Sequence, residues 1–214
     1  MLTGILLTGG HSTRMGRDKG LLKLGQKPMV LHVLEEMSGI VDEMVVSVGV
    51  GRKGDYEPIF AGKARITEDS KDDFGPLEGI RAAVSSSNSD LVAICPCDTP
   101  FVRAKIYKLL LEESEDTEGA VPIIRGFPEP LHAIYNRNAV ERACTKVVER
   151  GGFRVSEMFQ SMDLRFVQEK RIREVDRELS SFWNLNSPDD FRKAEMILAE
   201  SDLEKSSFSL AHTT

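Results

Sequence analysis

The chain has 214 residues, a net charge of −6 and a hydrophobic content of 41%. This composition is typical of a globular protein and excludes an intrinsically disordered chain. No segment approaches the roughly 18 consecutive apolar residues of a membrane span, and the N-terminus lacks the pattern of a secretory signal. Three cysteines are an odd set, which disfavours a secreted disulfide framework. We therefore expect a cytoplasmic protein with no membrane partner and, given its acidic balance, no nucleic-acid partner.

Strand-like and helix-like apolar patterns alternate along the first half of the chain. Helices are expected to begin at Pro28 and Pro76, because proline is favoured in the first turn of a helix. A long glycine-rich loop covers residues 8–20, between the first strand and the first helix. Residues 91–95 form a continuous apolar run, which is typical of a strand covered on both faces. The strands expected in this half lie at residues 2–7, 43–48, 64–67 and 91–95.

The second half repeats this alternation. Strands are expected at residues 120–124, 131–135 and 164–168, and the first two could pair antiparallel. Helices are expected at residues 104–113, 138–150 and 155–162, and from Ser187 to about Glu200. The alternation predicts an α/β fold with a mainly parallel sheet, in which the strand at 91–95 is central. We expect one domain over residues 1–200 and a mobile tail over residues 201–214.

The glycine-rich loop is the strongest chemical signal in the sequence. It reads LTGGHSTRMGRDK from Leu7 to Lys19 and carries an excess of positive charge in an acidic chain. Glycines after a strand let backbone N–H groups approach a phosphate, and basic side chains supply the counter-charge. The spacing matches neither the P-loop nor the dinucleotide-binding fingerprint. We expect this loop to bind a polyphosphate, with a solvated basic loop as the alternative.

Two acidic residues follow expected strands. Asp98 comes shortly after the strand at 91–95, and Asp69 follows the strand at 64–67. Ligands bind outside the carboxyl ends of the strands in open α/β sheets. The carboxylate of Asp98 can hold a Mg²⁺ ion beside a phosphate, although it can also cap the following helix. The carboxylate of Asp69 can accept hydrogen bonds from a guanine edge or a ribose hydroxyl, or can serve only the turn.

Five ordered segments resemble the molybdenum cofactor guanylyltransferases, the MobA family of the nucleotidyltransferase superfamily. They are the first loop with residues 25–28, then residues 68–79, 95–101, 130–135 and 184–188. The first motif alone indicates only the superfamily, whereas the ordered set is specific and spans the chain as far as the last helix. The resemblance implies a three-layer α/β fold of Rossmann-like, glycosyltransferase-A type, with a mainly parallel twisted sheet flanked by helices.

The resemblance also implies roles for individual residues. Arg14, Lys19 and Asp98 would be catalytic, with Asp98 as the ligand of Mg²⁺ or, alternatively, Mn²⁺. Asn184 and Asn186 would lie near the acceptor, although either could instead serve the turn before Ser187. The residues implied to contact the nucleotide are Leu7, Thr8, Gly9, Gly10, Arg14, Lys19, Ser47, Asp69, Gly75, Pro76, Gly79 and Asp98. Thr8 and Ser47 depart from the alanine and asparagine common in the family. His132 is expected to be a core or rim residue rather than a base.

The activity that the resemblance implies is the transfer of GMP from GTP to molybdopterin, with release of pyrophosphate and formation of molybdopterin guanine dinucleotide. The implied partners are GTP, molybdopterin or the molybdenum cofactor, cofactor-synthesis proteins and molybdoenzyme clients. One alternative is another nucleotidyltransferase on the same scaffold: a molybdopterin cytidylyltransferase, or a guanylyltransferase for cobinamide phosphate or phospholactate. Another alternative is a catalytically silent carrier of nucleotide or cofactor.

Overall fold

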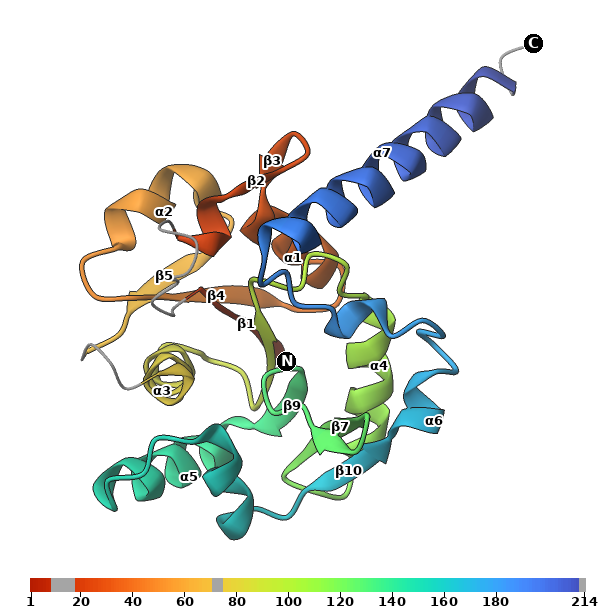
Figure 1. The fold of residues 1–214 in the computed structure, drawn as a ribbon. Coiled ribbons are helices and arrows are strands. Elements are labelled where there is room, and N and C mark those ends of the chain that lie inside the picture. The colour runs from red at the N-terminus through yellow and green to blue at the C-terminus, as the bar shows by residue number, and fades with distance from the viewer. Residues whose placement is uncertain (9–17, 71–74, 212–214) are drawn as a thin grey trace.

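The computed structural model describes residues 1–8, 18–70 and 75–211, with side chains as far as residue 200. A twisted sheet runs through the molecule and helices pack on both of its faces (Figure 1). The strands are β1 (Leu2–Leu7), β4 (Glu43–Val48), β5 (Arg65–Glu68), β6 (Leu91–Pro96), β7 (Gly119–Ile124), β8 (Phe127–Pro128), β9 (Ala133–Asn136) and β10 (Arg165–Gln168). A separate small hairpin consists of β2 (Lys23–Leu24) and β3 (Lys27–Pro28).

The helices account for most of the remaining described chain. The α-helices are α1 (Met29–Met37), α2 (Lys53–Phe60), α3 (Pro76–Ser85), α4 (Ala104–Glu113), α5 (Arg137–Glu149), α6 (Glu169–Ile172) and α7 (Pro188–Ala211). Short 3₁₀ helices are η1 (Lys19–Leu21), η2 (Val155–Ser161) and η3 (Ser180–Phe182). No helix in the described ranges combines the length and apolarity needed to cross a bilayer.

The strand order is β10-β7-β9-β6-β1-β4-β5, with β8 paired to β7 at the side. β1 pairs in parallel with both β4 and β6, and β5 pairs in parallel with β4. β9 is antiparallel to β6 and β7, which confirms the pairing expected for residues 120–124 and 131–135. The position of β6 between β1 and β9 confirms that the strand at 91–95 is central.

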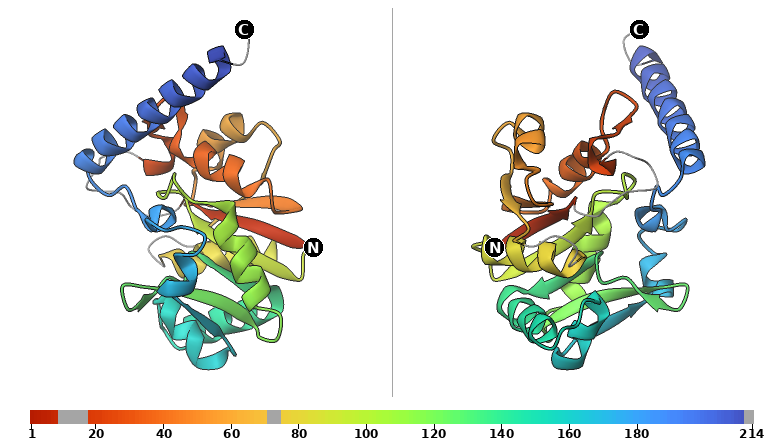
Figure 2. Two further views of the ribbon diagram at one scale, coloured as in Figure 1. Left: turned by 90° about the vertical axis from the view of Figure 1, so that its right-hand side faces the viewer. Right: turned by 60° about the vertical axis from the view of Figure 1, so that its left-hand side comes forward.

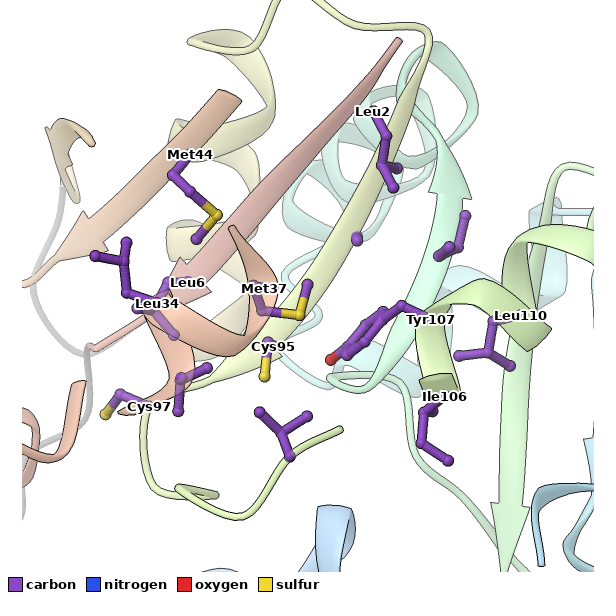
Figure 3. Packing of buried hydrophobic residues seen from close by; sticks show 14 of the residues in the cluster. Leu2, Leu6, Leu34, Met37, Met44, Cys95, Cys97, Ile106, Tyr107 and Leu110 are labelled. Carbon is purple, nitrogen blue, oxygen red and sulfur yellow. The ribbon is translucent and has the colours of Figure 1, made fainter. Parts of the chain in front are cut away.

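The hydrophobic core lies on both faces of the sheet. Leu6 of β1 packs with Met37 of α1, Cys95 of β6 and Tyr107 of α4 on one face (Figure 3). Ile5 and Leu7 point to the other face, where α3 and α5 supply the apolar partners. Alternate residues of β1 therefore serve two cores, which explains why the consecutive residues Ile5, Leu6 and Leu7 are all apolar. The three-layer α/β fold expected from the sequence is confirmed.

Two helices differ from the sequence-based expectation. α2 was not expected, because Gly54 and Pro58 lower the helix propensity of its short sequence. It forms because Tyr56 and Phe60, one turn apart, are fully buried against the core.

The expected end of α7 near Glu200 is wrong, since the helix continues to Ala211. No glycine or proline follows Pro188 to stop it. Its far end extends away from the sheet (Figure 2).

Gly119 in β7 should be intolerant of a side chain. A Cβ atom there would lie 2.5 Å from the carbonyl oxygen of Ile134 in β9, so the backbone of the strand pair would have to move. We expect Gly119→Ala to lower the free energy of unfolding by about 1–3 kcal/mol in chemical denaturation. Gly54→Ala in α2 is the control, because a Cβ at Gly54 meets nothing within 4 Å and should leave stability equal or higher. Equal stability of the two variants would contradict this packing.

Candidate active site

The candidate site begins where β1, β4 and β6 end. Leu7 stands opposite Ser47 of β4 and Pro96 of β6. One residue further on, the Thr8 N–H and hydroxyl both donate to the carbonyl of Ser47, at 3.0 Å and 2.8 Å. The Cys97 N–H donates to the carbonyl of Leu7 at 2.9 Å. The segments that leave β1 and β6 therefore start from the same level of the sheet.

Four of the residues expected at the site meet beyond this edge, from three separate parts of the chain. The Lys19 ammonium lies 3.5 Å from a carboxylate oxygen of Asp98 and donates to Asn186 Oδ1 at 2.6 Å. Asn184 Nδ2 donates to the other oxygen of Asp98 at 3.3 Å. The side chains of Lys19 and Asp98 are each only 19% exposed. This cluster of Lys19, Asp98, Asn184 and Asn186 combines a cation, a carboxylate and two amides in a partly desolvated place.

Backbone contacts hold the cluster together. The Leu185 N–H donates to the carbonyl of Asp98 at 2.9 Å, so the segment with both asparagines is tied to the turn after β6. The N–H groups of Asn186 and Ser187 donate to Asp190 Oδ2 at the start of α7, at 3.1 Å and 2.9 Å. Asn186 is thereby fixed by the N-terminus of the last helix. The side chain of Asn186 can therefore contact Lys19 while its backbone N–H takes part in the turn before α7.

A second polar group lies at the ends of β4 and β5. The Ser47 hydroxyl donates to Asp69 Oδ1 at 2.7 Å, and the Asp69 N–H donates to the carbonyl of Val48 at 2.9 Å. A Cβ at Gly79 in α3 would lie 2.9 Å from Ser47 Oγ, so glycine allows α3 to approach this pair. The structure thus brings Ser47, Asp69 and Gly79 together.

The start of α3 depends on Gly75. Its φ of 64° with ψ of −160° is a backbone conformation for which glycine is the usual residue, and Pro76 then occupies the first turn of the helix. Gly75 and Pro76 thus set where α3 begins beside Asp69. The expected site residues Gly9, Gly10 and Arg14 lie outside the described residues, and their roles stay predictions.

Glu78 is a site-supporting residue that the sequence reasoning missed. Its carboxylate is almost fully buried and accepts hydrogen bonds from Arg81 at 2.7 Å and 2.8 Å, and from the N–H and hydroxyl of Ser70. The Arg81 guanidinium and then Ser70 lower the pKa of Glu78 to about 2, against the opposing effect of burial. Ser70 follows Asp69, so this ionised carboxylate ties the Asp69 turn to α3. The three-residue spacing of Glu78 and Arg81 on a helix is the sequence feature that could have predicted this ion pair.

His132 is buried beside the cluster rather than exposed to it. It is 2% exposed, its Nε2 lies 3.3 Å from the Thr99 hydroxyl, and its ring packs against Phe182 with centroids 5.0 Å apart. Burial lowers the pKa of His132 to about 3, so the ring is neutral near pH 7. These observations agree with the core role expected for His132.

The donor set fits a divalent cation that shares its coordination with a phosphate. Within the described ranges, His, Cys, Asp and Glu side chains form no group of three or more that could enclose a metal. Mg²⁺ is commonly held by one or two carboxylates, substrate phosphates and water rather than by a protein cage. Asp98, with amide oxygens of Asn184 and Asn186 close by, provides oxygen ligands of that kind.

Comparison with known proteins gives one consistent result. The family model described as the MobA-like NTP transferase domain matches residues 4–163. A probable molybdenum cofactor guanylyltransferase from Methanosarcina mazei is 37% identical over 197 residues, covering 88% of this chain and 87% of that protein. A molybdenum cofactor guanylyltransferase from Desulfosudis oleivorans is 32% identical, covering 92% of this chain and 96% of that protein.

A solved structure agrees with these sequence relatives. The molybdopterin-guanine dinucleotide biosynthesis protein A from Archaeoglobus fulgidus superposes with a TM-score of 0.78 at 26% sequence identity. The match covers 92% of this chain and 99% of that chain. The structural similarity therefore covers most of the fold, and the family model spans the segments that carry Lys19 and Asp98.

The buried His132 should leave a signature in the pH dependence of stability. Between the folded pKa of about 3 and the ordinary value of 6.5, the unfolded chain binds a proton that the folded protein does not. This group therefore lowers the free energy of unfolding as the pH falls below 6.5, by up to about 1.4 kcal/mol per pH unit. We expect His132→Phe, which keeps a ring beside Phe182, to lose stability less steeply than wild type between about pH 5.5 and pH 4. The free energy of unfolding is measured in urea at each pH. If it falls equally steeply with pH for both proteins, folding does not lower the pKa of His132, and the prediction is wrong.

Proposed function

The chain belongs to the MobA-like NTP transferase family, and on this premise we propose that it transfers GMP from GTP to molybdopterin. Pyrophosphate would leave and molybdopterin guanine dinucleotide would be the product. The observation that carries the proposal is the meeting of Lys19 and Asp98 at the carboxyl ends of β1 and β6, with Asn186 in contact with Lys19. The names of the relatives from Methanosarcina mazei and Desulfosudis oleivorans support guanylyl transfer.

The reaction requires charge and positioning more than a base. An oxygen of the acceptor phosphate attacks the α-phosphorus of GTP, and the bond from that phosphorus to the bridging oxygen of pyrophosphate breaks. The attacking oxygen is already anionic, so no side chain has to remove a proton from it. Burial lowers the pKa of His132 beside the cluster to about 3, which makes it a weak base and agrees with this requirement. The chain then contributes alignment of the reacting groups and neutralisation of developing charge.

Each member of the cluster has a part in this proposal. Lys19 suits a phosphate oxygen as a compact positive charge and would stabilise the leaving pyrophosphate. Asp98 would hold Mg²⁺, with Mn²⁺ as the alternative, and such an ion supplies positive charge beside the α-phosphate when bound. Asn184 and Asn186 would orient the acceptor phosphate at the same place. Arg14, Gly9 and Gly10 are proposed to bind the triphosphate from the first loop.

The second polar group would bind the nucleoside. Asp69 is held by Ser47 at 2.7 Å and carries acceptor oxygens at the ends of β4 and β5. Guanine presents the N1–H and the 2-amino group on one edge, a donor pair that suits a carboxylate, whereas cytosine presents only its 4-amino group. Leu7 and Thr8 at the end of β1, with Gly75, Pro76 and Gly79 at the start of α3, would form the walls. This arrangement favours GTP over CTP.

The cellular setting is also a proposal. All three cysteines are buried free thiols, as expected of a protein in a reducing compartment, so we place the reaction in the cytoplasm. Proteins that supply molybdopterin and molybdoenzymes that accept the product would be the partners.

Pyrophosphate release in the presence of purified molybdopterin tests the proposal directly. With GTP and Mg²⁺ we expect release that depends on molybdopterin and a product that contains one GMP per molybdopterin. Release only with CTP would indicate a cytidylyltransferase, and release only with cobinamide phosphate or phospholactate would indicate another acceptor. Nucleotide binding without release under every combination would indicate a carrier.

Base selectivity should be visible in binding alone. With Mg²⁺ present, GTP should bind at least about ten times more tightly than CTP, a difference of roughly 1.4 kcal/mol, because Asp69 is proposed to accept hydrogen bonds from the guanine edge. Calorimetric titration of both nucleotides on one preparation measures this ratio. Superimposable titration curves, or tighter binding of CTP, would overturn the guanine assignment and leave the fold assignment intact.

Asp98→Asn should separate folding from catalysis. Asparagine keeps the size of the side chain, and the hydrogen bond from Leu185 uses the backbone carbonyl, so the variant should fold and melt close to wild type. Loss of the charge should lower the single-turnover rate of GMP transfer by about 10²–10³.

Asp116→Asn, which removes an exposed charge in the turn after α4, is the matched control and should transfer at the wild-type rate. Transfer by Asp98→Asn within about threefold of wild type at saturating Mg²⁺ would exclude Asp98 as an essential group.

A further inference from the structure

We infer that α2 positions Lys19 for phosphate binding, through a hydrogen bond from the buried hydroxyl of Tyr56 to Asp18. Tyr56 and Asp18 are then positioning residues, because they act through Lys19 rather than on the substrate. The inference rests on the part of the proposed function that makes Lys19 a phosphate ligand.

Asp18 connects the turn η1 to α2 through its carboxylate. Its Oδ1 accepts hydrogen bonds from the Gly20 N–H at 3.0 Å and from the Tyr56 hydroxyl at 2.7 Å. Its Oδ2 lies 3.1 Å from a guanidinium nitrogen of Arg52, which precedes α2. One carboxylate therefore caps η1, the turn that contains Lys19, and joins that turn to α2.

Tyr56 is suited to a fixed donor role. Its side chain is fully buried, and burial raises the pKa of the phenol well above its usual value of 10, so the hydroxyl keeps its proton. The fit around it is close, because a Cβ at Gly20 would lie 2.6 Å from the Tyr56 hydroxyl and 3.5 Å from Cys97 Sγ. Cys97 precedes Asp98, so η1, α2 and the turn after β6 are packed together at this point.

The side chain of Lys19 leaves this anchored turn on the side of the catalytic cluster. It reaches Asp98 at 3.5 Å and Asn186 at 2.6 Å, while its neighbour Asp18 is held from α2. The position of the ammonium therefore depends on contacts made by Asp18. Removing the Tyr56 hydroxyl leaves Asp18 with Gly20 and Arg52 but allows η1 to shift. Small misplacements of a charged group weaken its action on a phosphate strongly.

The probe for this inference is inorganic triphosphate, which has neither a base nor an acceptor. We expect Tyr56→Phe to weaken its binding by about tenfold in calorimetric titration, since one hydrogen bond to a charged group is lost. Tyr107→Phe is the matched control. Tyr107 is also fully buried, and its hydroxyl donates a hydrogen bond to the carbonyl of Ile94 at 2.8 Å and interacts with the Cys95 thiol. Its loss should lower the melting temperature and leave triphosphate affinity within about twofold of wild type.

A double-mutant cycle shows whether Tyr56 acts through Lys19. In a Lys19→Ala background, Tyr56→Phe should cause no further loss of triphosphate affinity, because the group it positions is gone. Equal losses in the two backgrounds, no loss in the wild-type background, or an equal loss from Tyr107→Phe would each overturn the inference. Absence of triphosphate binding by the wild-type protein would overturn it as well.

The outcome is independent of guanylyl transfer. If the wild-type protein binds triphosphate with the expected coupling between Tyr56 and Lys19 but transfers no GMP to molybdopterin, the proposed function fails and the positioning role stands. If GMP transfer is observed and the coupling is zero, the positioning role fails and the proposed function stands.

Discussion

The parallel pairing of β1 with both β4 and β6 creates the sheet edge at which the described residues of the candidate site gather. Leu7, Ser47 and Pro96 stand at one level, and the hydrogen bonds of Thr8 and Cys97 extend the pairing one residue past the strands. A slip of β1 by one residue would turn Leu6 to the other face of the sheet and exchange it with Ile5 and Leu7. The packing of both cores disfavours this exchange. The register is therefore fixed by burial, and the polar segments beyond the strands inherit that register.

Three segments hold the cluster of Lys19, Asp98, Asn184 and Asn186 together. The turn after β6 supplies Asp98, η1 supplies Lys19 and the segment before α7 supplies the asparagines. The stacked rings of Phe101 and Trp183, with centroids 5.5 Å apart, join the first and third of these segments beside the small apolar cluster under α7. The last helix is thus attached to the site at its first turn, although its far end extends away from the sheet. The opposite charges of Lys19 and Asp98, whose side chains are largely buried, are thus held in position by the protein itself.

Much of this arrangement follows from the sequence by simple rules. A continuous apolar run indicated β6, and the rule that ligands bind beyond the carboxyl ends of the strands predicted Asp98 and Asp69 at the same edge. The contact between Lys19 and Asn186 spans most of the chain length, and only the resemblance to a family suggested that both lie at one site. Local sequence patterns cannot predict a contact between residues that are so far apart along the chain.

Other features could not be predicted from sequence patterns. α2 contains both a glycine and a proline, and its signal was limited to two aromatic residues one turn apart. The hydrogen bonds from Tyr56 to Asp18 and from Ser70 to Glu78 join residues whose spacing has no fixed relation to geometry. The Ser- and Thr-rich C-terminal sequence has little apolar surface to bury and predicts a helix end near Glu200, whereas α7 continues to Ala211. Tertiary packing decided the first two features, whereas α7 continues because no glycine or proline follows Pro188.

We propose that Lys19 and Asp98 together form the phosphate-binding and metal-binding centre of one site. A crystal structure with Mg²⁺ and a GTP analogue that cannot be cleaved between its α- and β-phosphates tests this claim most directly. The account predicts the Lys19 ammonium within hydrogen-bond distance of a β- or γ-phosphate oxygen, and the Asp98 carboxylate bound to an ion beside the α-phosphate. A triphosphate that lies away from Lys19, or an ion that Asp98 does not contact, would contradict it.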